Sequence, residues 1–377
     1  METIETSSKV VLQGVPRVHF YAGGPRCPED ICSASVIRAV MEYLGENIGC
    51  DHCQSKGRSW GLRCSYAYFM GVMGSAWQVA WVPGWNEASF TPEYLPGSKE
   101  DPYRRALEAV GYAVEFVNPE AGEDVFRAKI VENIRDKGRP VIAFGIVGPP
   151  EPVIITGYDE DGDLLLGWSF FQDFPPFNEG LEYEINTTGQ PGYFRKRDWF
   201  KDAGGLVLIG EHGEMPDQEK IFEQSLRIGL DIMRTTQVKG APAGTAGYDA
   251  WAEHLMHDED FVGKTETELR HLHDAHNMGV GQIAEYRWYG SVWLVNTYAK
   301  AHYNLAEDLL KAAGCFAAEH ALMWQLWNLA GGNGNPDAWQ KFTDPEVRRQ
   351  MIPIILESRD KYAEGAAYIA QALKKLD

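Results

Sequence analysis

The spacing of apolar residues changes near residue 216, and this change predicts two domains. Before that point, short runs rich in β-branched residues alternate with turn signals, whereas long stretches with helical spacing follow it. The polar segment 211–216 separates the two patterns and comes directly after a strand-like run at 204–210. We therefore expect an α+β domain over residues 1–212 and an all-α helical bundle domain over residues 216–377.

Within the first part, the pattern predicts a helix whose first turn lies beside a cysteine. Residues 33–44 place Val36, Ile37, Val40 and Met41 on one face, and the stretch begins directly after Cys32. Further helices are expected at 103–110 and 125–137, strands at 140–146, 153–158 and 164–168, and a hairpin turn at 159–163. The expected architecture is an antiparallel sheet packed on the helix opened by Cys32.

Start and stop signals divide the second part into helices. Residues 217–236 carry an apolar stripe, Thr265 and Glu268 have the spacing of a capping box, and Asp344-Pro345 is a helix start. The Gly- and Asn-rich segment 331–336 interrupts the pattern. These signals predict five to seven helices.

Charge and composition exclude several classes of protein. The chain has 54 acidic and 35 basic residues, a formal net charge of −19, and such a field repels nucleic acid and anionic lipid surfaces. It lacks a long uncharged apolar window, and its first residues do not resemble a signal peptide, so we expect a soluble, cytoplasmic protein with no nucleic-acid or membrane partner. The 6 cysteines are too few for a disulfide scaffold.

Cys32 is the first candidate for chemistry. A thiol at a helix N-terminus is shifted towards the thiolate, because the helix dipole and the amide groups of the first turn stabilise negative charge. The alternative is that Cys32 is a small buried residue that begins a core helix.

Three segments in order carry a resemblance to a known family. They are the helix that follows Cys32 and ends in Tyr43-Leu44-Gly45, the segment Lys137-Gly-Arg-Pro-Val-Ile142, and the run Val153-Ile-Ile-Thr-Gly-Tyr-Asp-Glu-Asp-Gly162. Together they resemble papain-like cysteine peptidases of the bacteriocin-leader-processing type, and more specifically the butirosin biosynthesis protein H N-terminal domain family. The resemblance covers residues 15–210 and, more loosely, the helical part, which contains a similar segment at 246–253.

The resemblance implies a Cys nucleophile, a His base and an acidic residue that orients the His. Cys32 matches the nucleophile, but the His position falls on Glu151, and the strand at 164–169 lacks the acidic residue. Three explanations remain open. Glu151 is itself the base, or His19 or His52 approaches Cys32 in space, or the site has lost its chemistry and binds a ligand.

Aromatic and polar residues after the third expected strand are candidates for ligand contacts. Trp168 ends that strand, and Gln172 and Asp173 follow among phenylalanines. Apolar walls with a few polar groups are typical of small-molecule sites. We therefore take Trp168, Gln172 and Asp173 as ligand-binding candidates.

Metal and cofactor sites are not predicted. Cys50 and Cys53 form one CxxC pair, and Cys64 and Cys27 would have to complete it, whereas structural zinc usually takes two such pairs. Whether these thiols bind zinc stays open. The segment from Glu268 to His276 lacks the second copy that a di-iron bundle needs, so it is interpreted as a polar helix face, and no cofactor is expected.

The resulting functional hypothesis is an acyl- or amide-group transferase or hydrolase that acts through a Cys32 thioester. The resemblance implies acyl transfer from a carrier to an amine in secondary metabolism. The alternative is a catalytically inactive papain-like protein that binds a small or peptidic ligand in the Cys32 cleft. A homo-oligomer is compatible with Trp324, Trp327 or Trp339 being exposed on the bundle.

Overall fold

A computed structural model describes residues 3–6, 8–20, 28–46, 64–185, 191–298, 304–332 and 335–377. The chain forms two compact units. The first comprises Met1–Phe69 and Tyr103–Pro216, and the second comprises Met70–Pro102 and Asp217–Asp377. The sequence analysis placed residues 70–102 in the first domain, whereas they pack with the helical part of the chain.

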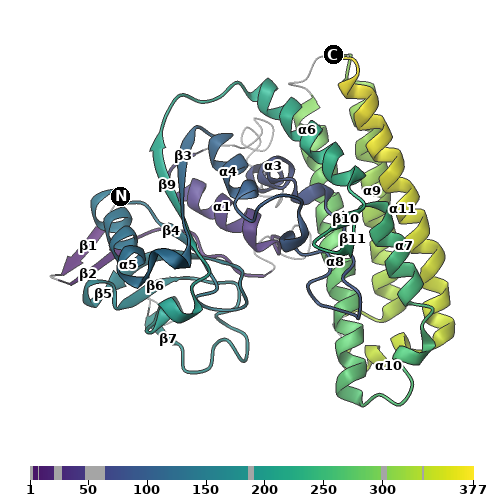
Figure 1. Ribbon diagram of the computed structural model, residues 1–377, viewed down its shortest axis with the longest axis horizontal. Helices are drawn as coiled ribbons and strands as arrows, with labels where there is room; N and C mark the ends of the chain where they lie inside the picture. The colour runs from purple at the N-terminus through teal and green to yellow at the C-terminus, as the bar shows by residue number, and fades with distance from the viewer. Residues whose placement is uncertain are drawn as a thin grey trace. The chain divides into compact units, whose positions relative to one another are not determined.

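The first unit is built on an antiparallel sheet (Figure 1). Its strands run in the order β3-β9-β4-β5-β6-β8-β7, and β2 pairs with both β1 and the end of β5. The strands are β1 (Thr3–Thr6), β2 (Lys9–Leu12), β3 (Tyr112–Val117), β4 (Val141–Phe144), β5 (Pro152–Asp159), β6 (Leu164–Trp168), β7 (Glu182–Ile185), β8 (Pro191–Lys196) and β9 (Leu206–His212). The expected antiparallel sheet is confirmed.

The central strands β4, β5 and β6 are apolar on both faces because both faces are covered. Residues 152–158 of β5 are all buried, and helix α1 (Cys32–Tyr43) packs against this strand. The unit also contains the beginning of α3 (Cys64–Met73), together with α4 (Asp101–Glu108) and α5 (Glu123–Val131), which continues as one π-helical turn at Glu132–Asp136. The sheet and α1 together place Cys32 at one end of the unit's core.

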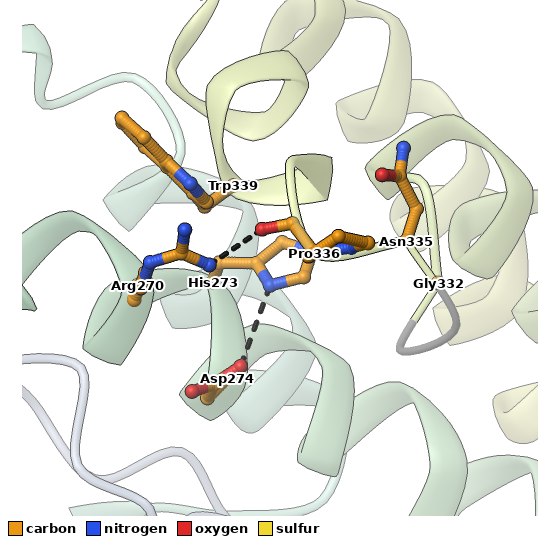
Figure 2. Close-up of a pocket in the computed structure, with 7 residues that line it drawn as sticks. All are labelled: Arg270, His273, Asp274, Gly332, Asn335, Pro336 and Trp339. Carbon is orange, nitrogen blue, oxygen red and sulfur yellow. Dashed lines mark hydrogen bonds and ion pairs between the residues drawn. The ribbon is translucent and has the colours of Figure 1, made fainter. Parts of the chain in front are cut away.

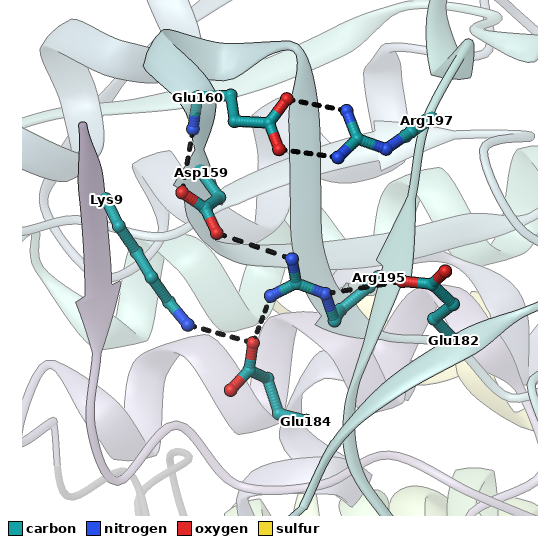
Figure 3. A network of polar contacts seen from close by, with 7 residues as sticks. All are labelled: Lys9, Asp159, Glu160, Glu182, Glu184, Arg195 and Arg197. Atoms are coloured by element: carbon teal, nitrogen blue, oxygen red, sulfur yellow. Dashed lines mark hydrogen bonds and ion pairs between the residues drawn. The ribbon is translucent and has the colours of Figure 1, made fainter.

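Charged side chains join four strands of this sheet (Figure 3). Arg195 on β8 pairs with Glu184 on β7 and lies 3.3 Å from Asp159 at the end of β5. Lys9 on β2 binds the same Glu184 carboxylate at 2.9 Å. Because these side chains are only partly exposed, the network fixes the pairing of strands that lie far apart in the sequence.

The second unit is a bundle in which α9 packs along both α8 and α11 (Figure 1). Its helices are α6 (Gln218–Arg234), α7 (Thr245–His254), α8 (Glu266–Tyr298), α9 (Ala306–Ala330), α10 (Ala338–Thr343) and α11 (Pro345–Leu373). The expected capping box is present, since the Thr265 amide donates to Glu268 and the Glu268 amide donates to Thr265. No helix in the described ranges combines the length and apolarity needed to cross a bilayer.

We expected an all-α domain from the sequence, but the second unit also contains two short strands. A hairpin of two-residue strands, β10 (Gln237–Val238) and β11 (Ala241–Pro242), connects α6 and α7. Lys239 and Gly240, between the strands, both have positive φ, at 48° and 85°. A tight two-residue hairpin turn requires two residues with positive φ. The sequence analysis did not predict this hairpin.

Two tryptophans of the segment 70–102 pack in the core of the bundle. Trp77 is fully buried and lies 5.8 Å from the Trp293 ring and 5.2 Å from the Phe316 ring, centroid to centroid. Trp81 stacks on Trp251 at 6.0 Å. Large aromatic rings bury too much area to be left outside a core, which explains why this segment leaves the first unit.

A buried ion pair between two helices also binds the segment 70–102 to the bundle. Arg287 on α8 lies 2.9 Å from Glu319 on α9, and both side chains are fully enclosed. Arg287 also donates to the carbonyls of Ala76 and Gln78, at 2.5 and 3.1 Å. Since these carbonyls belong to residues 70–102, the arginine binds that segment to the helices.

Candidate functional site

Cys32 is the first residue of α1, as the sequence predicts, and it is 7 % exposed. The preceding residue, Ile31, donates its amide hydrogen to the Tyr66 hydroxyl at 3.1 Å, which holds the chain where the helix begins. The α1 N-terminus provides a positive electrostatic potential at the thiol. A thiol at such a position is a candidate nucleophile.

A buried ion pair fixes the peptide on both sides of Cys32. Arg38, on α1, lies 3.0 Å from Glu29, which precedes the helix, and the two side chains are 1 % and 0 % exposed. Ser35 also donates to the Glu29 carboxylate at 3.5 Å. The loop that leads into the helix is thus bound to the helix itself.

Glu151 lies in the connection between β4 and β5, one residue before β5 begins, and is half-buried. Its backbone carbonyl accepts a hydrogen bond from Gly145 at 3.1 Å, which closes the connection into a compact loop. Gly145 has a φ of +78°, and a Cβ there would lie 2.5 Å from the Asp202 carbonyl oxygen. Only glycine fits this position, so the loop that carries Glu151 has a defined shape.

Tyr103 on α4 lies within electrostatic range of both Cys32 and Glu151. The tyrosine is 5 % exposed, and its ring meets that of Phe144 edge to face at 5.3 Å. Burial raises the pKa of Tyr103 well above its usual value, and the negative charges of Glu151 and of ionised Cys32 raise it further. The hydroxyl is therefore a neutral hydrogen-bond donor, influenced by both candidate groups.

Tyr103 was not identified from the sequence as a site residue. It was placed in an expected helix, and nothing in the local pattern separates it from a core tyrosine. The interaction depends on the fold, because Tyr103, Glu151 and Cys32 come from three separate segments.

Of the histidines considered as alternative bases, the structure describes one. The His19 ring binds the neighbouring Phe20 carbonyl through Nδ1 at 2.8 Å. His52 lies outside the described residues. Glu151 is the acid–base candidate that the described electrostatics link to the Cys32 region.

The three residues proposed to bind ligand differ in their surroundings. Gln172 is fully buried and its amide is used internally, accepting from the Ser169 amide at 3.0 Å and donating to the Gly192 carbonyl at 3.3 Å. These bonds close the turn after β6, and a role of Gln172 in ligand binding stays a prediction. Trp168 is half-buried, and Asp173 is exposed and forms an ion pair with Arg17.

The cysteines considered as zinc ligands lie mostly outside the described residues, so the question of zinc stays open. Cys27, Cys50 and Cys53 lie outside them, and of Cys64 only the backbone, at the start of α3, is described. Within the described ranges, no group of three or more His, Cys, Asp or Glu side chains is arranged to hold a metal ion.

The histidines of α8 do not form the polar helix face that was expected. His271 is exposed and lies 2.9 Å from Glu87, but His273 and His276 are 5 % and 0 % exposed. The His276 ring lies 4.7 Å from that of Phe342 and accepts the Trp251 indole hydrogen at 3.2 Å. The short helix α10, which carries Phe342, covers this face.

A small pocket of about 150 Å³ lies at the same end of α8 (Figure 2). Its walls are formed by Arg270, His273, Asp274, Gly332, Asn335, Pro336 and Trp339. Its polar groups bind one another: Arg270 donates to the Pro336 carbonyl at 2.5 Å, and its guanidinium lies 5.3 Å from the centre of the Trp339 ring. The pocket is therefore less suited to chemistry than the Cys32 site.

Comparison with known proteins does not assign the chain to a family. The papain-like fold and the relationship to the butirosin biosynthesis protein H family stay predictions from the three segments that carry the resemblance. The function is argued below from the arrangement of Cys32, Tyr103 and Glu151. Neither the protein-family models nor the curated proteins contain a match to this chain.

Proposed function

We propose that the protein transfers or hydrolyses an acyl group through a thioester on Cys32. The observation that supports this is the place of Cys32 as the first residue of the buried helix α1, with the charges of both Cys32 and Glu151 raising the pKa of the buried Tyr103 hydroxyl. It associates a candidate nucleophile at a helix N-terminus with a candidate base and a neutral hydrogen-bond donor.

In the first step, Glu151 removes the proton from the Cys32 thiol, and the sulfur attacks the acyl carbonyl carbon. The tetrahedral intermediate carries negative charge on oxygen, and in this proposal the N-terminus of α1 and the neutral Tyr103 hydroxyl stabilise it. Collapse breaks the bond to the leaving group, which takes the proton from Glu151. The product is the acyl group bonded to sulfur.

In the second step, an amine or water attacks the Cys32 thioester. Glu151 accepts a proton from this acceptor as the new bond forms, and the sulfur departs and regains a proton. An amine acceptor gives an amide, and water gives a carboxylic acid. The proposed substrates are small or peptidic acyl donors, and the resemblance adds acyl groups on a carrier protein.

The neutral state of Tyr103 is consistent with this role. A tyrosinate in the same position would repel both the ionised thiol and the oxyanion. Since burial and neighbouring negative charge both raise the pKa of Tyr103, the proton stays on its hydroxyl whether the negative charge lies on Glu151 or on Cys32.

A kinetic experiment with p-nitrophenyl butyrate tests the proposal. We expect a rapid release of p-nitrophenolate followed by a slower steady rate, because acylation precedes deacylation. The Cys32→Ala variant should lose both phases. The matched control is Cys315→Ala, which removes the other described free thiol and should behave as the parent protein.

The competing function, a cleft that binds a ligand without chemistry, makes a different prediction. It is favoured by the burial of Cys32, which is that of a core residue. It predicts no release of p-nitrophenolate above that of the Cys32→Ala variant.

A further inference from the structure

A group of phenylalanines in the first unit is incompletely buried. The rings of Phe170, Phe171 and Phe174 each meet that of Phe20 edge to face, with centroids 5.1, 5.4 and 5.5 Å away, and Phe177 contacts Phe171 at 5.4 Å. We call these five residues the Phe174 cluster. Its base, Phe170, is 1 % exposed, whereas Phe174 and Phe177 are 46 % and 38 % exposed. Grouped exposed aromatic rings are typical of binding surfaces.

The Phe174 cluster and Glu151 lie beyond the same end of neighbouring strands. Phe144, the last residue of β4, pairs with Pro152, the first of β5, and Trp168, the last of β6, pairs with Ile154. The segment 145–151, which ends in Glu151, and the segment 169–177, which carries most of the cluster, therefore emerge from adjacent strands side by side.

Direct contacts join the two segments. Ser169 donates to the Val147 carbonyl at 2.7 Å. Gly148 has a φ of +114°, and a Cβ there would lie 2.8 Å from the Phe171 ring. The aromatic cluster thus packs on the backbone of the loop that carries Glu151.

We infer that the Phe174 cluster binds an apolar acyl group of the substrate while its carbonyl carbon reacts at Cys32. This inference rests on the proposed function and adds the substrate class: acyl donors with a hydrocarbon chain, in preference to short or charged ones. The cluster consists only of aromatic hydrocarbon side chains. Asp173, which lies between Phe171 and Phe174 in the sequence, forms an ion pair with Arg17.

The size of the surface favours this occupant over a protein. Two exposed rings on three inner ones match a single chain or side group, whereas a stable protein interface involves about 20 to 30 residues on each side. The cluster also packs on the loop that carries Glu151, the proposed base, as expected of a surface that holds a group attached to the reacting carbonyl.

The test compares p-nitrophenyl acetate, butyrate and octanoate. Burial of each added methylene is worth about 0.8 kcal/mol, which corresponds to about a 4-fold increase in kcat/KM while the chain contacts the cluster. We expect the ratio of octanoate to acetate to fall at least 10-fold in the Phe174→Ser/Phe177→Ser variant. Ile185→Ser, a control that removes a 68 % exposed apolar residue of the same unit, should keep the ratio. An unchanged ratio in the double variant would overturn the inference.

A binding experiment separates this inference from the proposed function. N-ethyl octanamide, an unreactive amide, should bind the Cys32→Ala protein in calorimetry, and the two added Phe substitutions should weaken binding at least 10-fold. Binding without ester turnover would contradict the thioester chemistry and leave the apolar surface intact. Equal binding with and without Phe174 and Phe177 would refute the inference that the Phe174 cluster binds the acyl group. Light scattering that shows a dimer dissociated by these substitutions would also refute it, since a second copy would then be the occupant.

Discussion

Glu29 and Arg38 form an enclosed ion pair that spans the start of the helix on which Cys32 lies. The side chains are 3.0 Å apart and essentially inaccessible to solvent. Each charge has lost its hydration, so each depends on the other. The geometry of the Cys32 thiol is therefore coupled to a charged pair that does not itself take part in the proposed chemistry.

Replacing Arg38 with Met should strongly destabilise the first unit, because it leaves Glu29 buried without its cation. We expect a loss of about 3 kcal/mol or more in the free energy of unfolding, and a fall of about 10 °C in Tm. Arg135→Met is the control: its ion pair with Asp136 is about half exposed, so Tm should hardly change. Similar small shifts in both variants would mean that the Glu29–Arg38 pair does not stabilise this junction.

Replacing Tyr103 with Phe should slow acylation of Cys32 by at least about 10-fold, because the hydroxyl that donates to the developing charge is lost. The ring remains, so its contact with Phe144 and the thermal stability should be largely kept. Tyr112→Phe, which removes a hydroxyl bound to Glu46 at 2.8 Å elsewhere in the unit, serves as the control. Unchanged burst kinetics in the Tyr103→Phe variant would remove this residue from the mechanism.

The two described free thiols should differ in reactivity with iodoacetamide. Burial, assisted by the neighbouring Glu364 carboxylate, raises the pKa of Cys315 to about 11, so this thiol should stay unmodified at pH 8. Cys32, at a helix N-terminus, should be alkylated with a midpoint below the ~8.5 of a free thiol. Peptide mass spectrometry across a pH series measures both. Modification of Cys315 ahead of Cys32 would show that Cys32 is a core residue.

His276 should make the helical unit sensitive to mild acid. Burial lowers the pKa of His276 to about 3, and the charge of His273 contributes in the same direction. The unfolded chain therefore binds a proton below pH ~6.5 that the folded protein excludes, so stability falls as the pH decreases from 6.5 towards 3. At pH 5 the expected loss is about 2 kcal/mol at 1.36 kcal/mol per pH unit.

His276→Gln keeps an acceptor for the Trp251 indole but does not titrate, so its stability should change less between pH 7 and pH 5. His271→Gln, on the exposed side of α8, is the control and should retain the pH dependence of the parent protein. Denaturant unfolding at the two pH values measures the difference. A parental pH dependence in the His276→Gln variant would contradict the assignment.

Elements defined by local signals were predictable from the sequence. The helix at Cys32, the strands β4 to β6 and the capping box at Thr265 all follow from spacing and cap residues that act within a few positions. The assignment of residues 70–102 to the bundle was not predictable from the sequence. The sequence shows that Trp77 and Trp81 are apolar, but not which of the two cores they enter.

The site was predictable only in part, for the same reason. Cys32 was identified by its position at the start of a helix, and Glu151 by its match to the His position that the family resemblance implies. Tyr103 and the internal role of Gln172 depend on contacts between segments far apart in the sequence. His273 and His276 were interpreted as a polar face because the sequence does not show that Phe342 covers them.

The most direct test of the account is detection of the acyl group on Cys32. The protein is mixed with p-nitrophenyl butyrate, quenched in acid within seconds, digested and analysed by mass spectrometry. We predict a butyryl adduct on the peptide that contains Cys32, also present in Cys315→Ala and formed more slowly in Glu151→Gln. Absence of that adduct during p-nitrophenolate release, or an undiminished adduct on the Cys32→Ala protein, would contradict the proposed thioester.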